Sequence, residues 1–286
     1  MYYLLLILFY PIAALPLRVL YVLSDVLCFF IYRVFSYRVA VVKDNLRHAF
    51  PDKDEAAIDA ITKVFYKNFC DQWIEMLKLL SVSDKELTRR FTGNWEILEQ
   101  LRQANRNAYV LMGHTFNWEW ANVVSQLNIR QQMAGVYLPL ENNAFDRFVL
   151  KLRNRAGGMM ISMKARKEAF AKLQNKLHVL GLIADQNPSN LNNVLWVNFM
   201  HREAPFFIGL AYMAQKNKAA VVLSKIIKTK RGHYTLIMER LCDDASAMHA
   251  EDIVRAYVAH LEQQIQEQPT NYMWTHRRWK HTKPTV

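Results

Sequence analysis

The feature that most constrains the fold is an alternation of short apolar runs and longer segments with helical spacing, which extends from residue 107 to residue 266. Apolar runs typical of β-strands occupy residues 107–112, 133–138, 179–184, 219–227 and 233–238. Apolar residues recur at three- and four-residue steps in residues 118–127, 143–155, 164–177, 208–216 and 252–266. Strands that alternate with helices predict an α/β fold, in which helices flank a mostly parallel central sheet.

The N-terminus has a different pattern. Residues 1–17 carry no charged side chain, and a second apolar run, residues 19–32, follows Arg18. A helix that spans a bilayer needs about 20 apolar residues, so the first run is slightly short. We expect residues 1–35 to form a membrane anchor, which either dips into the bilayer or spans it with Arg18 reaching the interface. Residues 36–286 then form a single further domain. A secretory signal peptide and a buried core helix are the alternatives for the apolar segment.

The chain is strongly basic, with 37 Lys and Arg against 25 Asp and Glu and a formal net charge of +12. This balance predicts an acidic partner, which is anionic lipid, an acidic protein or nucleic acid. Four of the basic residues follow the apolar segment closely: Arg33, Arg38, Lys43 and Arg47. The positive-inside tendency would keep them, and the rest of the chain, in the cytoplasm. The three cysteines form no C-x-x-C pair, which suits a reducing compartment and gives no sign of a zinc site.

His114 and Glu119 are the first candidates for chemistry. The apolar run 108–112 leads into Gly113 and His114, and Glu119 lies five positions later. An imidazole can take a proton from a hydroxyl near neutral pH, and a neighbouring carboxylate fixes its tautomer and stabilises the imidazolium. The structural alternative is that His114 caps a helix and Glu119 lies in the first helical turn, where acidic residues are favoured anyway.

Asp185 is a second acidic candidate, because it follows the apolar run 179–184 as His114 follows its own run. Ligands of open α/β sheets usually bind at the carboxyl ends of the strands. The sequence contains no G-x-S-x-G, H-E-x-x-H, P-loop or G-x-G-x-x-G motif. Serine hydrolase, phosphoryl-transfer and dinucleotide chemistry are therefore disfavoured, and we expect no metal site and no bound cofactor.

Four ordered blocks give the sequence a wider context. They are G-H-x4-E from Gly113 to Glu119, GVYLP at residues 135–139 continuing through Glu141 to Arg153 and Arg155, ADQNP at residues 184–188, and YMWTHRRWK at residues 272–280. With the apolar N-terminus, these blocks resemble the bacterial lipid A biosynthesis acyltransferases, the late lauroyl/myristoyl-type enzymes of the lysophospholipid acyltransferase superfamily. The resemblance covers nearly the whole chain. The second block of that family usually reads Y-R-P, and Leu138 replaces the Arg here.

The resemblance implies an O-acyltransferase at the bacterial inner membrane, with its catalytic domain on the cytoplasmic face. His114 would act as general base on a hydroxyl of the acceptor lipid, and Glu119 would orient and polarise His114. The activated oxygen would attack the thioester of an acyl carrier protein, or of an acyl-CoA, without an acyl-enzyme intermediate. The developing oxyanion needs hydrogen-bond donors, for which backbone amides near Gly113 and an arginine are both candidates.

The resemblance also implies residues that bind the acceptor, which would be a phosphorylated glycolipid precursor of lipid A. Arg153 matches the functional arginine of the second block, and its bidentate fork suits phosphate. Arg155 ranks below it, because residues two apart on a helix face different ways. Asp185 would orient an active-site group or complete the acceptor pocket, and Asn117 is a further candidate for substrate binding. A solvated helix arginine and a loop-capping aspartate are the structural alternatives.

Residues 276–280 form a basic cluster with an aromatic residue inside it. We expect contacts with lipid phosphates, the acidic carrier protein or both, rather than with nucleic acid, because the aromatic residues lack a stacking-platform pattern. A second basic group can be read as a solvated hairpin face: Lys225, Lys228, Lys230 and Arg231. Lipid A acylation is the leading function. The alternatives are acylation of another lysolipid, glycolipid or aminolipid, and a non-catalytic membrane scaffold.

Overall fold

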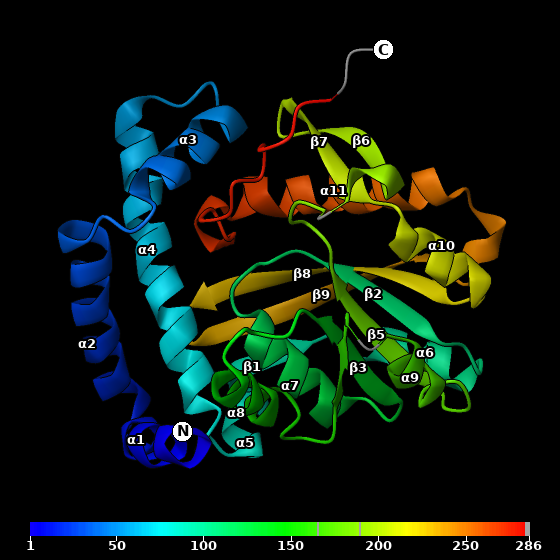
Figure 1. Ribbon diagram of the computed structural model, residues 1–286, viewed down its shortest axis with the longest axis horizontal. Helices are drawn as coiled ribbons and strands as arrows, with labels where there is room; N and C mark the ends of the chain where they lie inside the picture. Colours follow the sequence, from blue (N-terminus) through cyan, green and yellow to red (C-terminus); the bar gives the residue numbers. More distant parts are fainter. Residues whose placement is uncertain (165, 189, 284–286) are drawn as a thin grey trace.

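The computed structural model describes residues 1–164, 166–188 and 190–283, so the last three residues of the predicted domain 36–286 lie outside the described part of the chain. The fold is α/β, as predicted, with a seven-stranded sheet in the order β1-β9-β8-β2-β5-β3-β4 (Figure 1). Its strands are β1 (Phe91–Gly93), β2 (Ala108–Met112), β3 (Gln132–Tyr137), β4 (Met159–Ser162), β5 (His178–Ile183), β8 (Ala220–Lys230) and β9 (His233–Cys242). Neighbouring strands are parallel except for the antiparallel pair β8–β9.

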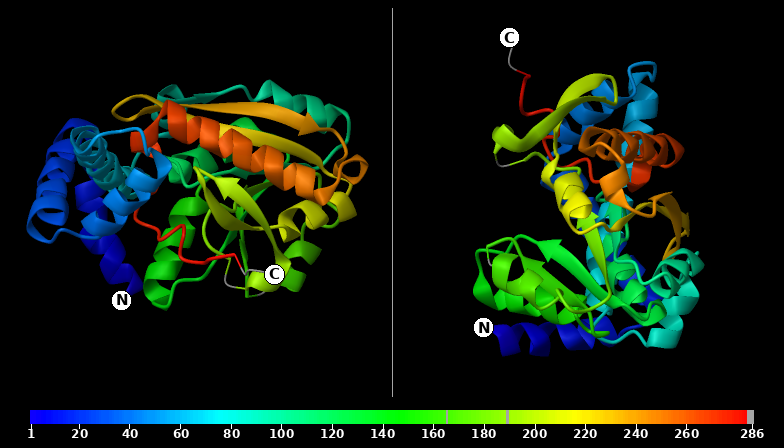
Figure 2. Two further views of the ribbon diagram at one scale, coloured as in Figure 1. Left: turned by 90° about the horizontal axis from the view of Figure 1, so that it is seen from above. Right: turned by 90° about the vertical axis from the view of Figure 1, so that its right-hand side faces the viewer.

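Two hydrophobic clusters cover the two faces of the sheet. Because side chains alternate along a strand, Tyr109 and Leu111 of β2 belong to one cluster and Ala108 and Val110 to the other. α10 (Gly209–Lys216) and α11 (Ala250–Glu267) pack in the first cluster, and α6 (Glu96–Gln103), α7 (Trp118–Asn128) and α8 (Asn143–Arg153) pack in the second. The helices therefore lie on opposite sides of the sheet (Figures 1 and 2).

The remaining helices connect or cover these layers. α4 runs past the ends of the strands, contributes to both hydrophobic clusters and is capped by Asp54, which accepts a hydrogen bond from Ala57 N at 2.8 Å (Figure 1). The bounds of these elements are α3 (Val39–Ala49), α4 (Glu55–Lys78), α5 (Asp84–Arg90) and α9 (Arg166–Ala171), with short 3₁₀ turns at Leu191–Asn193, Ala245–Ala247 and Pro269–Asn271.

Four strands were not predicted from the sequence. β1 and β4 are short, and an antiparallel pair outside the main sheet, β6 (Val194–Phe199) and β7 (Arg202–Phe207), packs against α11. Short strands lack a long alternating pattern, and the three residues of β1 are held by pairing with β9, which is distant in sequence. Long-range pairing of this kind leaves little local signal for a sequence-based prediction.

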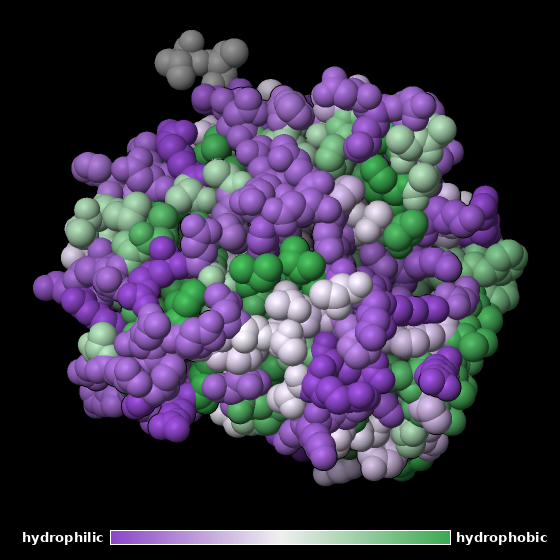
Figure 3. Space-filling model, turned by 180° about the vertical axis from the view of Figure 1, so that it is seen from behind, coloured by the Kyte–Doolittle hydropathy of each residue, from purple (hydrophilic) through white to green (hydrophobic). Residues whose placement is uncertain are grey.

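The N-terminal apolar segment forms α1 (Tyr2–Ala14), α2 (Leu17–Cys28) and a π-helical turn η1 (Phe29–Val34). Among the described residues, no single helix is long and apolar enough to cross a membrane, but α1 and the continuous stretch Leu17–Val34 pass that test together, bent by 114°. Both helices lie beside α4 (Figure 2). They leave large apolar side chains exposed on their outer side, which is part of the hydrophobic edge seen in Figure 3. These side chains include Leu4, Ile7, Leu8, Val19, Val22, Val26, Phe29 and Phe30.

Candidate active site

Two parallel strands bring His114 and Asp185 together. β2 and β5 are paired in register, with Met112 opposite Ile183, so the segments that follow them leave the sheet side by side. Gly113 allows the close approach of this loop to α11, because a Cβ atom there would collide with the side chain of Leu261. The carboxyl edge of the sheet therefore holds a histidine and an aspartate that are 71 residues apart in sequence.

Asp185 binds His114 at two points. Its Oδ1 lies 2.6 Å from His114 Nδ1, and its Oδ2 accepts a hydrogen bond of 3.0 Å from the backbone N–H of His114. The aspartate side chain is 1% exposed and the histidine side chain 21% exposed. Burial by itself raises the pKa of Asp185, but the His114 ring and the hydrogen bonds from His114 hold that pKa below its usual range. With Nδ1 used by Asp185, Nε2 is the ring nitrogen left to exchange a proton with a substrate.

Glu119 has a different partner from the predicted one. Its buried carboxylate accepts two hydrogen bonds from Arg153, 2.9 Å from Nε and 2.6 Å from Nη2, and a third of 3.0 Å from the indole N–H of Trp118. The catalytic role predicted for Glu119 stays a prediction, but the contact with His114 Nδ1 is made by Asp185 instead. The reason is that Glu119 lies in the first turn of α7 and points to the end of α8, where Arg153 is the last helical residue.

Trp118 connects the His114–Asp185 contact with the Glu119–Arg153 ion pair. Its ring lies edge-on to the His114 ring, with centroids 5.3 Å apart and planes at 79°, while its indole N–H donates to Glu119. One continuous row of contacts, the catalytic row, thus runs from Asp185 through His114, Trp118 and Glu119 to Arg153. Although burial alone would lower the pKa of Arg153, the Glu119 carboxylate raises it, so the guanidinium stays charged in this row.

Asn117 and Arg155, the other two predicted substrate-binding residues, lie outside this row of contacts. Asn117 is fully buried, accepts a hydrogen bond from Trp120 N at 2.9 Å as the N-cap of α7, and donates to Glu75 at 2.7 Å. Arg155 donates to Asp84 at 2.6 Å and to a carbonyl near the end of α4, and it hydrogen-bonds neither Asp185 nor Glu119. The side chain of Asn117 is therefore occupied within the protein, and Arg155 is held by the end of α4 and the start of α5.

A C-terminal segment hydrogen-bonds to the loop that carries His114. This contact was not predicted from the sequence. We call residues 271–279 the C-terminal strap. The backbone N–H of Met273 donates to the carbonyl of His114 at 3.0 Å, and Phe116 N donates to Asn271 O at 2.9 Å. The Asn271 side chain donates back to Phe116 O at 2.6 Å, and a β-bridge joins Thr115 to Tyr272. The strap therefore fixes the backbone on both sides of Thr115. Only the unusual density of aromatic residues in this block hinted at burial.

The basic cluster at the end of the strap is not a continuous surface. The Arg278 side chain is 2% exposed, donates to Asn187 Oδ1 at 3.1 Å and to Pro205 O at 2.9 Å, and lies over the Phe206 ring at 4.2 Å. Trp279 is also buried. The expected contact with lipid phosphates or a carrier protein therefore does not apply to Arg278. Arg277 remains exposed beside it.

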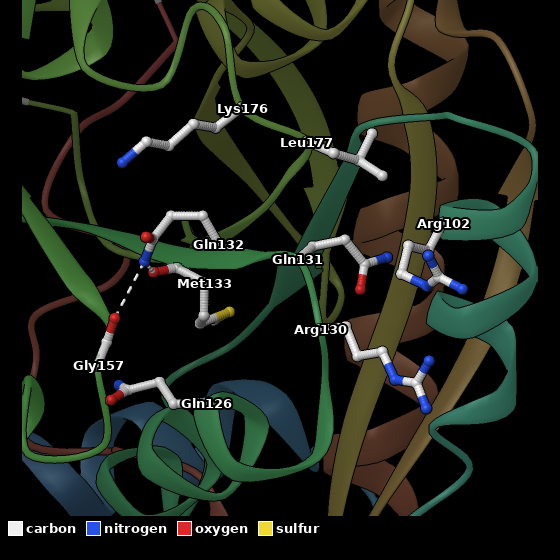
Figure 4. A pocket seen from close by; sticks show the side chains of 9 residues that line it. All are labelled: Arg102, Gln126, Arg130, Gln131, Gln132, Met133, Gly157, Lys176 and Leu177. Carbon is white, nitrogen blue, oxygen red and sulfur yellow. Dashed lines mark hydrogen bonds between the residues drawn. The ribbon is translucent and has the colours of Figure 1, made fainter.

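A separate hollow of about 580 Å³ lies at the amino ends of strands β3 and β5 (Figure 4). It borders Gln132 at the start of β3 and Leu177 just before β5, and Arg102, Arg130 and Lys176 contribute cationic side chains to its wall. His114 and Asp185 follow the carboxyl ends of their strands, so this hollow is remote from them. In the described part of the chain, no group of three or more His, Cys, Asp or Glu side chains is arranged to hold a metal ion.

Comparison with known proteins assigns the chain to a family. A model of the family described as bacterial lipid A biosynthesis acyltransferase matches residues 1–281. The chain belongs to this family. A search of curated proteins found no match. Family membership indicates an acyltransferase of lipid A biosynthesis, whose substrates are an acyl donor and a lipid A acceptor. The lipid A acyltransferase family is generally membrane-associated.

Proposed function

We propose that the protein transfers a fatty acyl chain from the thioester of an acyl carrier protein to a hydroxyl of a phosphorylated lipid A precursor, with His114 as general base. The observation that carries this proposal is the buried contact of Asp185 with His114 Nδ1, because it leaves Nε2 as the proton acceptor at the carboxyl edge of the sheet. The proposal agrees with the acyl donor and lipid A acceptor that family membership indicates.

In the proposed mechanism, His114 Nε2 takes the proton of the acceptor hydroxyl while that oxygen attacks the thioester carbonyl carbon. Asp185 keeps the proton of the ring on Nδ1 and stabilises the imidazolium. When the tetrahedral intermediate collapses, the carbon–sulfur bond breaks, an ester forms, and the imidazolium returns its proton to the leaving thiolate. No covalent acyl-enzyme is needed. Atoms and charges balance with the two substrates alone.

Arg153 is proposed to bind a phosphate of the acceptor. Its Nε and Nη2 atoms donate to Glu119, and Nη1 has no hydrogen-bond partner within the described ranges. Because Glu119 fixes the plane of the guanidinium, the remaining N–H groups point in defined directions and can donate to a phosphate oxygen. Glu119 would then act on catalysis by holding Arg153 and Trp118, rather than by contacting the base.

We propose that the reaction takes place at the cytoplasmic face of the inner membrane. The exposed apolar side of α1 and α2 suits insertion at a bilayer surface, and a net charge of +12 favours anionic lipids and an acidic carrier protein. No bound cofactor is proposed. An acyl-CoA donor would lack the acidic protein surface, so the carrier-protein thioester is the better substrate.

The test is acyl transfer by detergent-solubilised protein from acyl carrier protein thioesters to a Kdo-bearing tetraacyl lipid A precursor, followed by mass spectrometry. A product one acyl chain heavier is expected. His114→Ala should lower its rate by about 100-fold or more. His249→Ala, which removes an exposed histidine at the start of α11, should keep the wild-type rate. Equal rates in all three proteins would refute the assignment of His114.

A different class of acceptor is the second candidate. Leu138, which is 66% exposed, stands at the position where the family usually has an arginine. A phosphorylated acceptor would find one cation fewer there. Transfer to another lysolipid, glycolipid or aminolipid, with none to the lipid A precursor, would keep the catalytic mechanism and change the acceptor. No transfer to any acceptor would favour the scaffold function.

A further inference from the structure

Glu75 is a fully buried carboxylate that the mechanism above does not use. It lies on α4 and accepts three hydrogen bonds, from Tyr21 OH at 2.8 Å, Tyr234 OH at 2.7 Å and Asn117 Nδ2 at 2.7 Å. Burial raises its pKa, which the nearby Lys228 opposes. A buried polar group costs free energy unless it is hydrogen-bonded, so the three donors make the burial of Glu75 possible. They come from three different elements, which Glu75 therefore joins.

One of the three elements is α2 of the apolar N-terminal segment. Its outer side exposes Val22 and Val26, whereas its inner side turns polar groups toward α4. Tyr21 reaches Glu75, and Ser24 donates to Asp71 at 2.7 Å. The helix therefore has an apolar surface for a membrane and a polar surface that docks on the catalytic domain.

The polar surface of α2 has two separate anchor points on α4. Asp71 also accepts hydrogen bonds from Arg231, whose guanidinium reaches Asp25 of α2, and from Lys228. These basic residues of the β8–β9 hairpin are therefore ion-paired rather than simply solvated. This first anchor joins α2, α4 and the hairpin.

The second anchor, Glu75, continues to the active site. Asn117, which donates to Glu75, is the N-cap of α7, and Trp120 donates its indole N–H to the backbone carbonyl of Glu75 at 2.7 Å. Asn117 and Trp120 flank Trp118 and Glu119, the residues that contact His114 and hold Arg153. The first turn of α7 is thus fixed on Glu75 from both ends.

We propose that Glu75 is a positioning residue that couples the docking of α2 to the geometry of the catalytic row. When α2 is seated, Tyr21 completes the hydrogen bonds of Glu75, which holds Asn117 and the start of α7 in the position that places Trp118 against His114. When α2 is displaced, Glu75 loses a donor and the start of α7 loosens. The effect of this coupling on turnover rests on the proposed acyl transfer, whereas the hydrogen bonds that carry the coupling do not depend on it.

Glutamine at position 75 should preserve the arrangement. Its amide oxygen can accept from Asn117 and Tyr234, which both donate to Oε2, and its NH₂ group can donate to the Tyr21 hydroxyl oxygen, which accepts as well as donates. Alanine would remove the acceptor of the buried Asn117 and Tyr234 side chains and of the partly buried Tyr21 hydroxyl. The Gln and Ala variants therefore separate the hydrogen-bond pattern from the mere presence of a side chain.

The test compares Tyr21→Phe with Ser24→Ala as its matched control. Each substitution removes one hydroxyl hydrogen bond between α2 and α4, but only Tyr21 reaches Glu75. We expect Tyr21→Phe to lower kcat by about 10-fold with the donor KM within about twofold, and Ser24→Ala to keep kcat within about twofold. Glu75→Gln should stay within about threefold of wild type, whereas Glu75→Ala should lose about 100-fold.

Hydrogen–deuterium exchange in residues 113–128 provides a readout that does not depend on activity. Faster exchange there in Tyr21→Phe, with wild-type exchange in Ser24→Ala, would support the coupling even if no acyl transfer were found, in which case only the proposed function fails. If the wild-type protein is active but Tyr21→Phe and Ser24→Ala behave alike in both measurements, the coupling is wrong. A Glu75→Gln variant as impaired as Glu75→Ala would also overturn it.

Discussion

At the scale of single residues, Asp185 is the carboxylate that serves the proposed base. Asp185→Asn replaces an oxygen that binds His114 Nδ1 by a neutral amide, so the wrong tautomer is favoured and the imidazolium loses its partner. We expect kcat to fall by roughly 100- to 10,000-fold in a variant that still folds cooperatively. Steady-state acyl transfer and thermal unfolding measure this. Near-normal turnover would show that His114 does not depend on Asp185.

The same residue predicts how stability depends on pH. A carboxyl group whose pKa is lowered by folding adds stability above its ordinary value, here 3.8, and this stability is lost as the pH falls through the lowered pKa. Asp185→Asn removes this contribution. Urea unfolding between pH 6 and pH 3 should therefore show a smaller loss of unfolding free energy in the variant than in the wild type. An identical pH dependence would contradict a lowered pKa.

Arg153 and Arg155 offer a matched pair for acceptor binding. Arg153→Lys keeps the charge but loses the two-point contact with Glu119 that orients the guanidinium. We expect the acceptor KM to rise by about 10- to 100-fold, the scale of charge-assisted hydrogen bonds, with a smaller change in kcat. Arg155→Lys should change neither, because Arg155 pairs with Asp84 instead. Equal effects of both substitutions would argue against a phosphate-binding role for Arg153.

At the scale of elements, the C-terminal strap depends on one buried arginine. Arg278→Ala removes two hydrogen bonds and leaves Asn187 and Pro205 O without their donor. We expect a loss of about 3 kcal/mol in the free energy of unfolding. The neighbouring exposed Arg277→Ala should stay within about 0.5 kcal/mol. Urea unfolding of both variants tests this, and a similar change in the two would mean that burial of Arg278 contributes little to stability.

At the scale of the whole molecule, the apolar outer side of α2 predicts membrane binding. Replacing exposed Val22 and Val26 by Glu should lower partition into phosphatidylethanolamine–phosphatidylglycerol vesicles by about 10-fold or more, without unfolding the domain. Glu at the exposed positions Gln103 and Asn175 adds the same charge elsewhere and is the control. Vesicle flotation measures both. Equal losses would show that net charge, rather than this surface, determines binding.

The sequence predicted the elements that carry a long periodic pattern and missed those that depend on distant partners. α7 and α11 lie close to their predicted ranges, because their apolar residues recur at helical spacing over ten or more positions. The three-residue strand β1 exists through its pairing with β9, which no local pattern records. The strap was noticed for its residue types, but its contacts with His114 and Phe116 required the tertiary structure.

The sequence by itself determined the α/β class, the apolar N-terminus and the short set of side chains able to do the chemistry, because periodicity and residue type are properties of the chain alone. Only the tertiary structure decided which carboxylate contacts which basic side chain. Asp185 meets His114 because β5 lies beside β2, and Glu119 meets Arg153 because α7 begins next to the end of α8. Such neighbours are chosen by the packing of segments that are far apart in sequence, so nearness along the chain is a poor guide to them.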